Sequence, residues 1–255
     1  MVKSVFVVGL AGSGKTTVSY SLYEWYHNIN QRVAILNLDP GVQILPYTPD
    51  VDVREYVTTW DIMEKYSVGP NTAFLLSMDL LLDYVDKINE KVNSINPEIL
   101  IIDTPGQMEI FAYRSSGKLL VDLLAGDEKM ILFVIDGVFV KDPRNLVSNF
   151  LVALSVKVRF ELPFLIALNK IDMLKEGELS KIFKYTRNMP HLYRSLLRHY
   201  SADESMFLTR VFALMKKYGL VINVIPISAI TLDNVDLLIQ AISRILFRGE
   251  EYIEL

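Results

Sequence analysis

Cysteine is absent from this sequence of 255 residues. The chain therefore forms no disulfide bond and offers no thiolate to a metal ion. Positive charge is also limited, because 26 Lys and Arg residues face 30 Asp and Glu residues, which gives a formal net charge of −4. This balance argues against a polyanion held by bulk electrostatics, and we predict no direct nucleic-acid binding.

Long apolar runs, repeats and low-complexity linkers are absent as well. No run approaches the roughly 18 apolar residues that span a bilayer. The apolar start from Ser4 to Leu10 is short and has no cleavage site after it. We therefore expect a soluble, cytoplasmic protein without a membrane partner, folded as one domain over residues 1–255.

Short β-branched runs alternate with helical patterns along the chain. Such near-continuous apolar strands are buried on both faces, which predicts a mostly parallel sheet between layers of helices. The expected strands are Val2–Val8, Val33–Leu38, Ile99–Asp103, Met130–Asp136, Phe164–Asn169 and Leu220–Ile227.

Helices are expected between these strands, with starts near Lys15, Asp79, Gln107, Pro143 and Leu232. A further helical stretch at about 175–217 is longer than one crossover needs and is rich in Lys, Arg, Tyr and Met. We interpret it as an inserted lid or a partner-facing pair of helices. The expected fold is an α/β three-layer sandwich of the P-loop NTPase type with an inserted helical segment.

Gly9 to Thr16 read Gly-Leu-Ala-Gly-Ser-Gly-Lys-Thr and directly follow the first apolar run. Glycines at this spacing let consecutive backbone N–H groups point at phosphate oxygens, and the next helix adds the positive end of its dipole. Lys15 supplies a charge for the β- and γ-phosphates, and the Thr16 hydroxyl is a ligand for Mg²⁺. The phosphate-binding residues are then Gly12, Ser13, Gly14, Lys15, Thr16 and Thr17.

Asp103-Thr104-Pro105-Gly106-Gln107 ends another buried strand, which places Asp103 at the carboxyl edge of the sheet. A carboxylate there is predicted to hold Mg²⁺ through a water molecule, and the Gly106 N–H is predicted to sense a γ-phosphate. The structural alternative is an aspartate that caps the next helix. After a phosphate loop, the metal-binding interpretation is favoured.

Asn169-Lys170-Ile171-Asp172 follows a further strand. The Asp172 carboxylate can accept hydrogen bonds from guanine N1–H and the 2-amino group, a pair that adenine does not present, while the Lys170 stem lies along the base. The Ser228-Ala229 pair fits a loop that closes on the guanine carbonyl with a backbone N–H. We therefore predict GTP and GDP as substrate and product. The alternative is an ATP-dependent ATPase or kinase, which shares the phosphate loop but gives no reason for Asn169 to Asp172.

Two further segments are not expected in ordinary small GTPases. Asn37-Leu38-Asp39-Pro40-Gly41, followed by Tyr47 to Arg54, supplies carboxylates near the phosphate end. Gly69-Pro70-Asn71 is the second segment, and it also has a plain interpretation, because Gly-Pro and Pro-Asn are ordinary turn dipeptides.

In this order the motifs resemble those of the GPN-loop GTPases, a family named for the Gly-Pro-Asn tripeptide. The resemblance covers essentially the whole chain. It implies a homodimer in which Asn71 of each loop reaches the partner's nucleotide. It also implies that Asp39 lies near Mg²⁺ and the attacking water, and that Gln107 orients this water. Glu109 matches the acidic residue of the family's Gln-x-Glu, without an assigned role.

The resemblance further implies Mg²⁺-dependent hydrolysis of GTP, in which Lys15, Asp39, Asn71, Gln107 and Glu109 form the catalytic set. Closure of the dimer would time this reaction. A second function, compatible with the first, is that of a regulatory or assembly factor whose interaction surface is switched by hydrolysis. The client protein is unknown, and the resemblance points to RNA polymerase or other assembly machinery.

Overall fold

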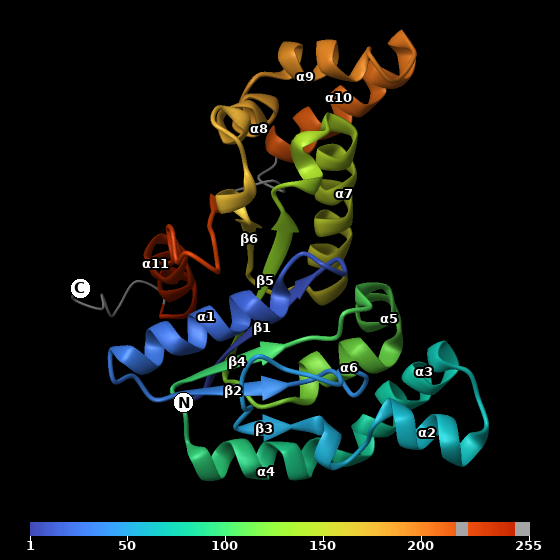
Figure 1. The fold of residues 1–255 in the computed structure, drawn as a ribbon, viewed down its shortest axis with the longest axis vertical. Coiled ribbons are helices and arrows are strands. Elements are labelled where there is room, and N and C mark those ends of the chain that lie inside the picture. The colour runs from blue at the N-terminus through green and yellow to red at the C-terminus, as the bar shows by residue number, and fades with distance from the viewer. Residues whose placement is uncertain (218–223, 248–255) are drawn as a thin grey trace.

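A parallel sheet of seven strands forms the centre of the computed structural model, which describes residues 1–217 and 224–247 (Figure 1). The strand order is β3-β2-β4-β1-β5-β6-β7, and every neighbouring pair is parallel. The strands are β1 (Lys3–Gly9), β2 (Val33–Asn37), β3 (Val51–Asp52), β4 (Ile99–Asp103), β5 (Glu128–Asp136), β6 (Phe164–Asn169) and β7 (Val224–Pro226). The predicted parallel sheet is confirmed.

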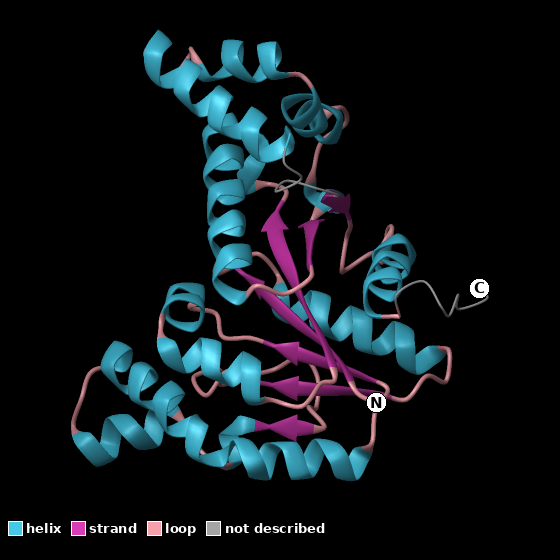
Figure 2. Ribbon diagram, turned by 180° about the vertical axis from the view of Figure 1, so that it is seen from behind, coloured by secondary structure: helices cyan, strands magenta, loops and turns pink. Residues whose placement is uncertain are grey.

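Helices cover both faces of this sheet (Figures 1 and 2). They are α1 (Lys15–Asn28), α2 (Thr59–Tyr66), α3 (Pro70–Leu80), α4 (Val85–Ile95), α5 (Met108–Tyr113), α6 (Ser115–Leu123), α7 (Pro143–Phe160), α8 (Glu178–Arg187), α9 (Met189–Leu196), α10 (Ala202–Lys217) and α11 (Val235–Leu246). Short 3-10 turns lie at Val53–Glu55, Leu81–Tyr84, Phe139–Lys141 and Ile171–Met173.

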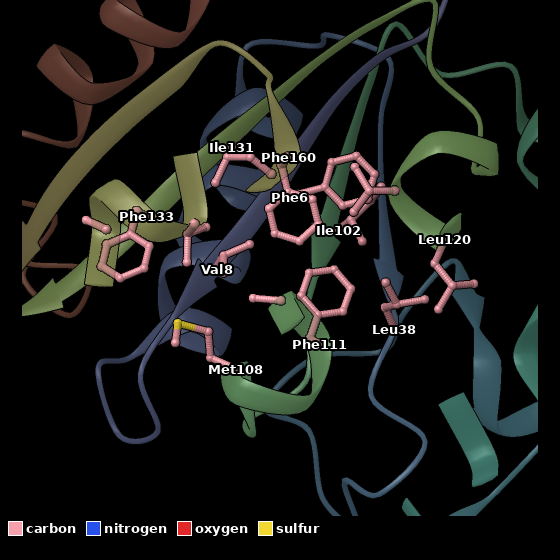
Figure 3. Close-up of a cluster of buried hydrophobic side chains, with 14 of the residues drawn as sticks. Phe6, Val8, Leu38, Ile102, Met108, Phe111, Leu120, Ile131, Phe133 and Phe160 are labelled. Carbon is pink, nitrogen blue, oxygen red and sulfur yellow. The ribbon is translucent and has the colours of Figure 1, made fainter. Parts of the chain in front are cut away.

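The two faces of the sheet bury separate hydrophobic clusters, because successive side chains of a strand point to opposite faces. Val5 and Val7 of β1 join the cluster beneath α1 and α11. Phe6 and Val8 join the cluster beneath α4, α6 and α7, part of which Figure 3 shows around Phe111. The result is the three-layer sandwich that the alternating sequence pattern predicts.

The expected helical segment at about 175–217 is present as α8, α9 and α10. Figure 1 shows these helices gathered at the end of the molecule beyond α7. Phe212 of α10 packs edge-on against Phe150 of α7, with ring centroids 5.3 Å apart. The segment therefore contains three helices where a pair was one interpretation, and it packs on α7 through buried aromatic rings.

Several expected boundaries were wrong. A helix was expected to start near Asp79, but Asp79 lies near the end of α3, which begins at Pro70. The helix expected near Leu232 begins at Val235. The two-residue strand β3 was not expected at all. Of the strand expected over Leu220–Ile227, residues 220–223 lie outside the described residues.

Gly117 permits the tight junction between α5 and α6. A Cβ at this position would overlap the Phe111 carbonyl oxygen, which is backbone and cannot rotate away. We expect Gly117→Ala to lower the free energy of unfolding by about 1–3 kcal/mol or more, measured by urea denaturation. Gly69→Ala is the control, because a methyl there meets open space and should cost within about 1 kcal/mol. Equal losses in the two variants would contradict this packing argument.

Candidate nucleotide-binding site

Strand register brings polar residues together at one edge of the sheet. Asp103 at the end of β4 is level with Asn37 of β2 and Val7 of β1. Across β1, Asp136 of β5 is level with Asn169 of β6. Ligands of open α/β sheets bind outside the carboxyl ends of the strands, so this edge is the expected place for a nucleotide.

The phosphate loop connects β1 to α1 at this edge. Gly12 and Gly14 have φ angles of 76° and 92°, in the left-handed region that favours glycine. Gly14 is required for a second reason, because a Cβ there would collide with the Asn169 side-chain nitrogen. The loop borders a cleft of about 470 Å³, whose walls include Gly12, Gly14, Lys15, Thr16, Thr17, Asp39, Asp103, Gly106 and Lys170.

Lys15 is buried, with 5% of its surface exposed. Its ammonium group donates hydrogen bonds to the carbonyl oxygens of Gly9 and Leu10, at 3.0 and 3.1 Å. Burial lowers its pKa, and the nearby carboxylates of Asp103 and Asp39 oppose this change. The group therefore lies in the loop among opposite charges, where a phosphate can exchange for the two carbonyl oxygens.

Asp103 has one engaged and one unengaged carboxylate oxygen. Oδ2 accepts a hydrogen bond of 3.0 Å from the Tyr47 hydroxyl, whereas Oδ1 is buried and has no hydrogen-bond partner among the described residues. Burial raises the pKa of Asp103 to about 6, against the influence of the hydroxyls of Thr16 and Tyr47 and the charge of Lys15. An unpartnered carboxylate oxygen beside a threonine hydroxyl is a donor set that fits Mg²⁺.

Asp39 links two loops at the phosphate end. Its Oδ1 accepts from the Gly41 N–H at 2.8 Å, and its Oδ2 accepts from the Gly106 N–H at 3.1 Å. The amide predicted to sense a γ-phosphate is therefore paired with a carboxylate in this structure. Asn37 holds the backbone of Asp39, because the Asn37 side-chain oxygen accepts a hydrogen bond of 3.1 Å from the Asp39 N–H.

Arg54 holds the segment that follows Asp39. Its guanidinium bonds both oxygens of Asp52, including a 2.6 Å ion pair, and donates to the carbonyl oxygens of Val42 and Gln43. Asp52 in turn accepts from the Asn37 side chain at 2.9 Å. These contacts connect the 41–54 segment to the end of β2.

The base end of the site is built around Asn169. Its side-chain nitrogen donates to the Ser13 carbonyl oxygen, and its side-chain oxygen accepts from the Ala229 N–H, both at 3.1 Å. The Lys170 ammonium donates to the Gly12 carbonyl oxygen at 2.6 Å and to Asp136 at 2.7 Å. Two residues of the guanine motif thus contact the phosphate loop.

Asp172 and Ser228 complete the predicted base site. Asp172 is exposed in the turn Ile171–Met173, as a group that receives a base would be. Ser228 is buried, and its hydroxyl accepts from the Thr231 N–H at 3.1 Å. Because the Ala229 N–H is engaged with Asn169, the predicted bond from this loop to a guanine carbonyl stays a prediction.

Three predicted catalytic residues are not part of the cleft wall. Gln107 precedes α5 as its N-cap residue, Glu109 lies in the first turn of that helix, and both are exposed. Asn71 is exposed in the first turn of α3. Their catalytic roles stay predictions.

Comparisons with known proteins agree with this geometry. A family model described as "conserved hypothetical ATP binding protein" matches residues 7–247. A GPN-loop GTPase of Pyrococcus abyssi is 37% identical over 193 residues, which cover 74% of this chain and 75% of that protein. A crystal structure of a Pyrococcus abyssi GTPase in its apo form superposes with a TM-score of 0.83 and 30% identity, covering 95% of this chain and 97% of that one.

The chain belongs to the GPN-loop GTPase family. GPN-loop GTPase 1 of Dictyostelium discoideum is 36% identical over 67% of this chain, and that of Schizosaccharomyces pombe is 35% identical over 70%. These alignments cover 44% and 49% of the two relatives, so the chain spans about half the length of these larger proteins.

The GPN tripeptide of this family member opens α3. Gly69 is the N-cap residue and Pro70 occupies the first helical position, where its missing N–H costs nothing. Pro70 also borders a second, larger cleft of about 1100 Å³, together with Trp60 and the 40–45 segment. Trp60 is 67% exposed beside it.

Sequence reasoning assigned no individual role to four polar residues of this GPN-loop site, although the first three lie in segments that it singled out: Asn37, Tyr47, Arg54 and Asp136. Asn37 and Asp136 carry a usable signal, because each is a polar residue at the end of an apolar strand run. Tyr47 carries none, because its partner lies 56 positions away, whereas Arg54 follows its carboxylate partner Asp52 by two positions.

Proposed function

We propose that this chain hydrolyses GTP to GDP and inorganic phosphate as a Mg²⁺-dependent homodimer. One observation carries the proposal: the phosphate loop, the Lys15 ammonium and the carboxylates of Asp39 and Asp103 converge on one cleft. Phosphoryl transfer to water needs mainly positioning and charge stabilisation, which this set of groups can supply.

The roles follow from position and charge. Lys15 would exchange its two loop carbonyl oxygens for phosphate oxygens and neutralise part of their charge. Asp39 and Gln107 would hold the attacking water in line with the γ-phosphate. Thr16, Asp39 and Asp103 would hold Mg²⁺, which supplies further positive charge beside the phosphates when bound.

Phosphate release from GTP and from ATP tests this function. We expect steady turnover of GTP in the presence of Mg²⁺, none with EDTA, and little turnover of ATP. ATP hydrolysis at an equal rate would favour the ATPase or kinase alternative, and the description of the family model names ATP binding. Guanine is favoured here because the Asp172 carboxylate can accept from both guanine donors, a pair that adenine lacks, and Asn169 and Lys170 hold this motif beside the phosphate loop.

Guanine selectivity should depend on Asp172, whose carboxylate receives both guanine donors in this proposal. Asp172→Asn should weaken GTP binding by about 1–3 kcal/mol, because buried guanine donors lose their partner. The variant should instead favour xanthosine triphosphate, whose 2-oxo group accepts a hydrogen bond. Titration with fluorescent nucleotide analogues measures both affinities. Unchanged preference for GTP in Asp172→Asn would remove Asp172 from the base site.

The homodimer is supported by the place of Asn71. This residue is exposed outside its own chain's nucleotide cleft, so a phosphate contact from it would come from a second copy. Light scattering with GDP and with a non-hydrolysable GTP analogue tests the proposal. A monomer under both conditions would contradict it.

We also propose that hydrolysis switches an interaction surface during assembly of a larger machine, with RNA polymerase or other assembly machinery as the client. This part rests on the family resemblance. Among the described residues, no helix is both long and apolar enough to cross a membrane. Mass spectrometry of proteins captured by GTP-bound and GDP-bound forms tests the client, and cell fractionation tests a cytoplasmic location.

A further inference from the structure

Tyr47 is the residue through which the loop after β2 contacts the carboxylate at the end of β4. Its hydroxyl donates to Asp103 Oδ2 across 56 positions of sequence, and both groups are buried. None of the motifs that define the nucleotide site includes this contact. It nevertheless engages the carboxylate expected to hold the cation.

Packing around the Tyr47 ring holds it in place independently of its contact with Asp103. Only 9% of the residue is exposed, and its ring stacks on Tyr20 of α1 with centroids 5.9 Å apart and an interplanar angle of 17°. Pro46 and Pro49 flank it within three positions, and each restricts the backbone there. A hydroxyl on a ring held in this way defines a direction for the carboxylate that accepts from it.

The hydroxyl engages one carboxylate oxygen and leaves the other free. Because Oδ2 is held, rotation of the carboxyl group is restricted, and Oδ1 stays available, with no hydrogen-bond partner in the part of the chain that the structure describes. Hydrogen bonds to a metal-binding carboxylate from outside the metal's own ligand set orient it and tune its affinity. We propose that Tyr47 is a positioning residue that aims Asp103 Oδ1 at the divalent cation of the nucleotide complex.

This inference rests on the proposed Mg²⁺-dependent function and adds to it a specific hydrogen bond. A competing role for the hydroxyl predicts the opposite change in cation affinity. If the Tyr47 hydroxyl occupied a position that the cation or its water must take, its removal would tighten cation binding. Positioning requires that removal weaken cation binding.

A titration of the protein·GDP complex with Mn²⁺ separates these roles. The electron paramagnetic resonance signal of free Mn²⁺ measures how much of the ion is bound. In Tyr47→Phe we expect the dissociation constant for Mn²⁺ to rise about 10–100-fold, as for other orienting partners of metal ligands. GDP affinity measured in EDTA should stay unchanged, because the hydroxyl acts on the carboxylate and not on the nucleotide.

Tyr20→Phe is the matched control, because it removes the same group from the ring stacked on Tyr47. This control should bind Mn²⁺ like the wild type, and Asp103→Asn gives the full effect of losing the carboxylate. Unchanged or tighter Mn²⁺ binding in Tyr47→Phe would overturn the positioning role. A parallel loss of GDP affinity in EDTA would also overturn it, since the hydroxyl would then support the loop as a whole. If the wild-type complex binds no Mn²⁺, the proposed cation dependence itself fails.

Discussion

Gln107→Ala should lower kcat for GTP hydrolysis about 100-fold and leave GTP affinity almost unchanged. Gln107 is exposed and directly follows Gly106, whose N–H donates to Asp39, so its side chain can reach a water beside that carboxylate. Its contact with water would form mainly in the transition state, and such contacts affect kcat rather than binding. Single-turnover phosphate release and a nucleotide titration measure the two effects.

Asp39→Ala should give a similar loss of kcat by removing the other group that holds the water. Asp39→Asn is a useful companion, because an amide oxygen can still accept from the Gly41 or Gly106 N–H while the negative charge is lost. Both variants should therefore be slow if the charge matters. For the Gln107→Ala variant, turnover near the wild-type rate would show that another residue orients the attacking water, and Glu109 would be the first candidate.

The second large effect concerns Asn71, for which the family resemblance and the plain turn interpretation disagree most. If its side chain completes the partner's active site, Asn71→Ala should bind nucleotide and stay folded, yet lose most of its hydrolysis. A residue that only shapes the turn would change stability alone. Thermal unfolding and phosphate release on the same preparation distinguish these results.

Mixing two inactive proteins tests whether Asn71 acts across a dimer. In a mixed dimer of Lys15→Ala and Asn71→Ala subunits, the Asn71→Ala subunit keeps its own Lys15 and receives an intact Asn71 from its partner. One of the two sites should then recover. If the subunits exchange, as shown by fluorescence transfer, and activity stays at the level of the separate variants, the proposed homodimer mechanism is wrong.

The sequence predicts those parts of the site that local spacing defines. The phosphate loop lies within one strand, turn and helix, and Asp103 and Asn169 each end an apolar run, so their place at the sheet edge follows from strand direction. Contacts between segments that are distant in the sequence cannot be predicted from local spacing. The Tyr47 to Asp103 bond and the attachment of Asn169 to Ser13 become visible only when the strands are aligned.

The errors in the fold have local physical causes. Gly69-Pro70-Asn71 offers a turn as its plain interpretation, yet proline is also favoured at the first position of a helix, and α3 begins there. The strand β3 has only two residues and owes its existence to pairing with β2, which no short pattern reveals. The segment at 175–217 forms three helices because the chain breaks at Asn188 and after Leu196. These breaks are hard to predict, since polar residues are frequent throughout the segment.

The Asn169 side chain has a consequence for how the nucleotide is held. One amide group bonds both the Ser13 carbonyl oxygen and the Ala229 N–H, and the missing side chain of Gly14 leaves room for it beside the phosphate loop. Movement of the loop around the base therefore pulls on the loop around the phosphates. Filling either half of the pocket lowers the entropy cost of ordering the other, so guanosine and polyphosphate fragments should each bind far more weakly than the intact nucleotide.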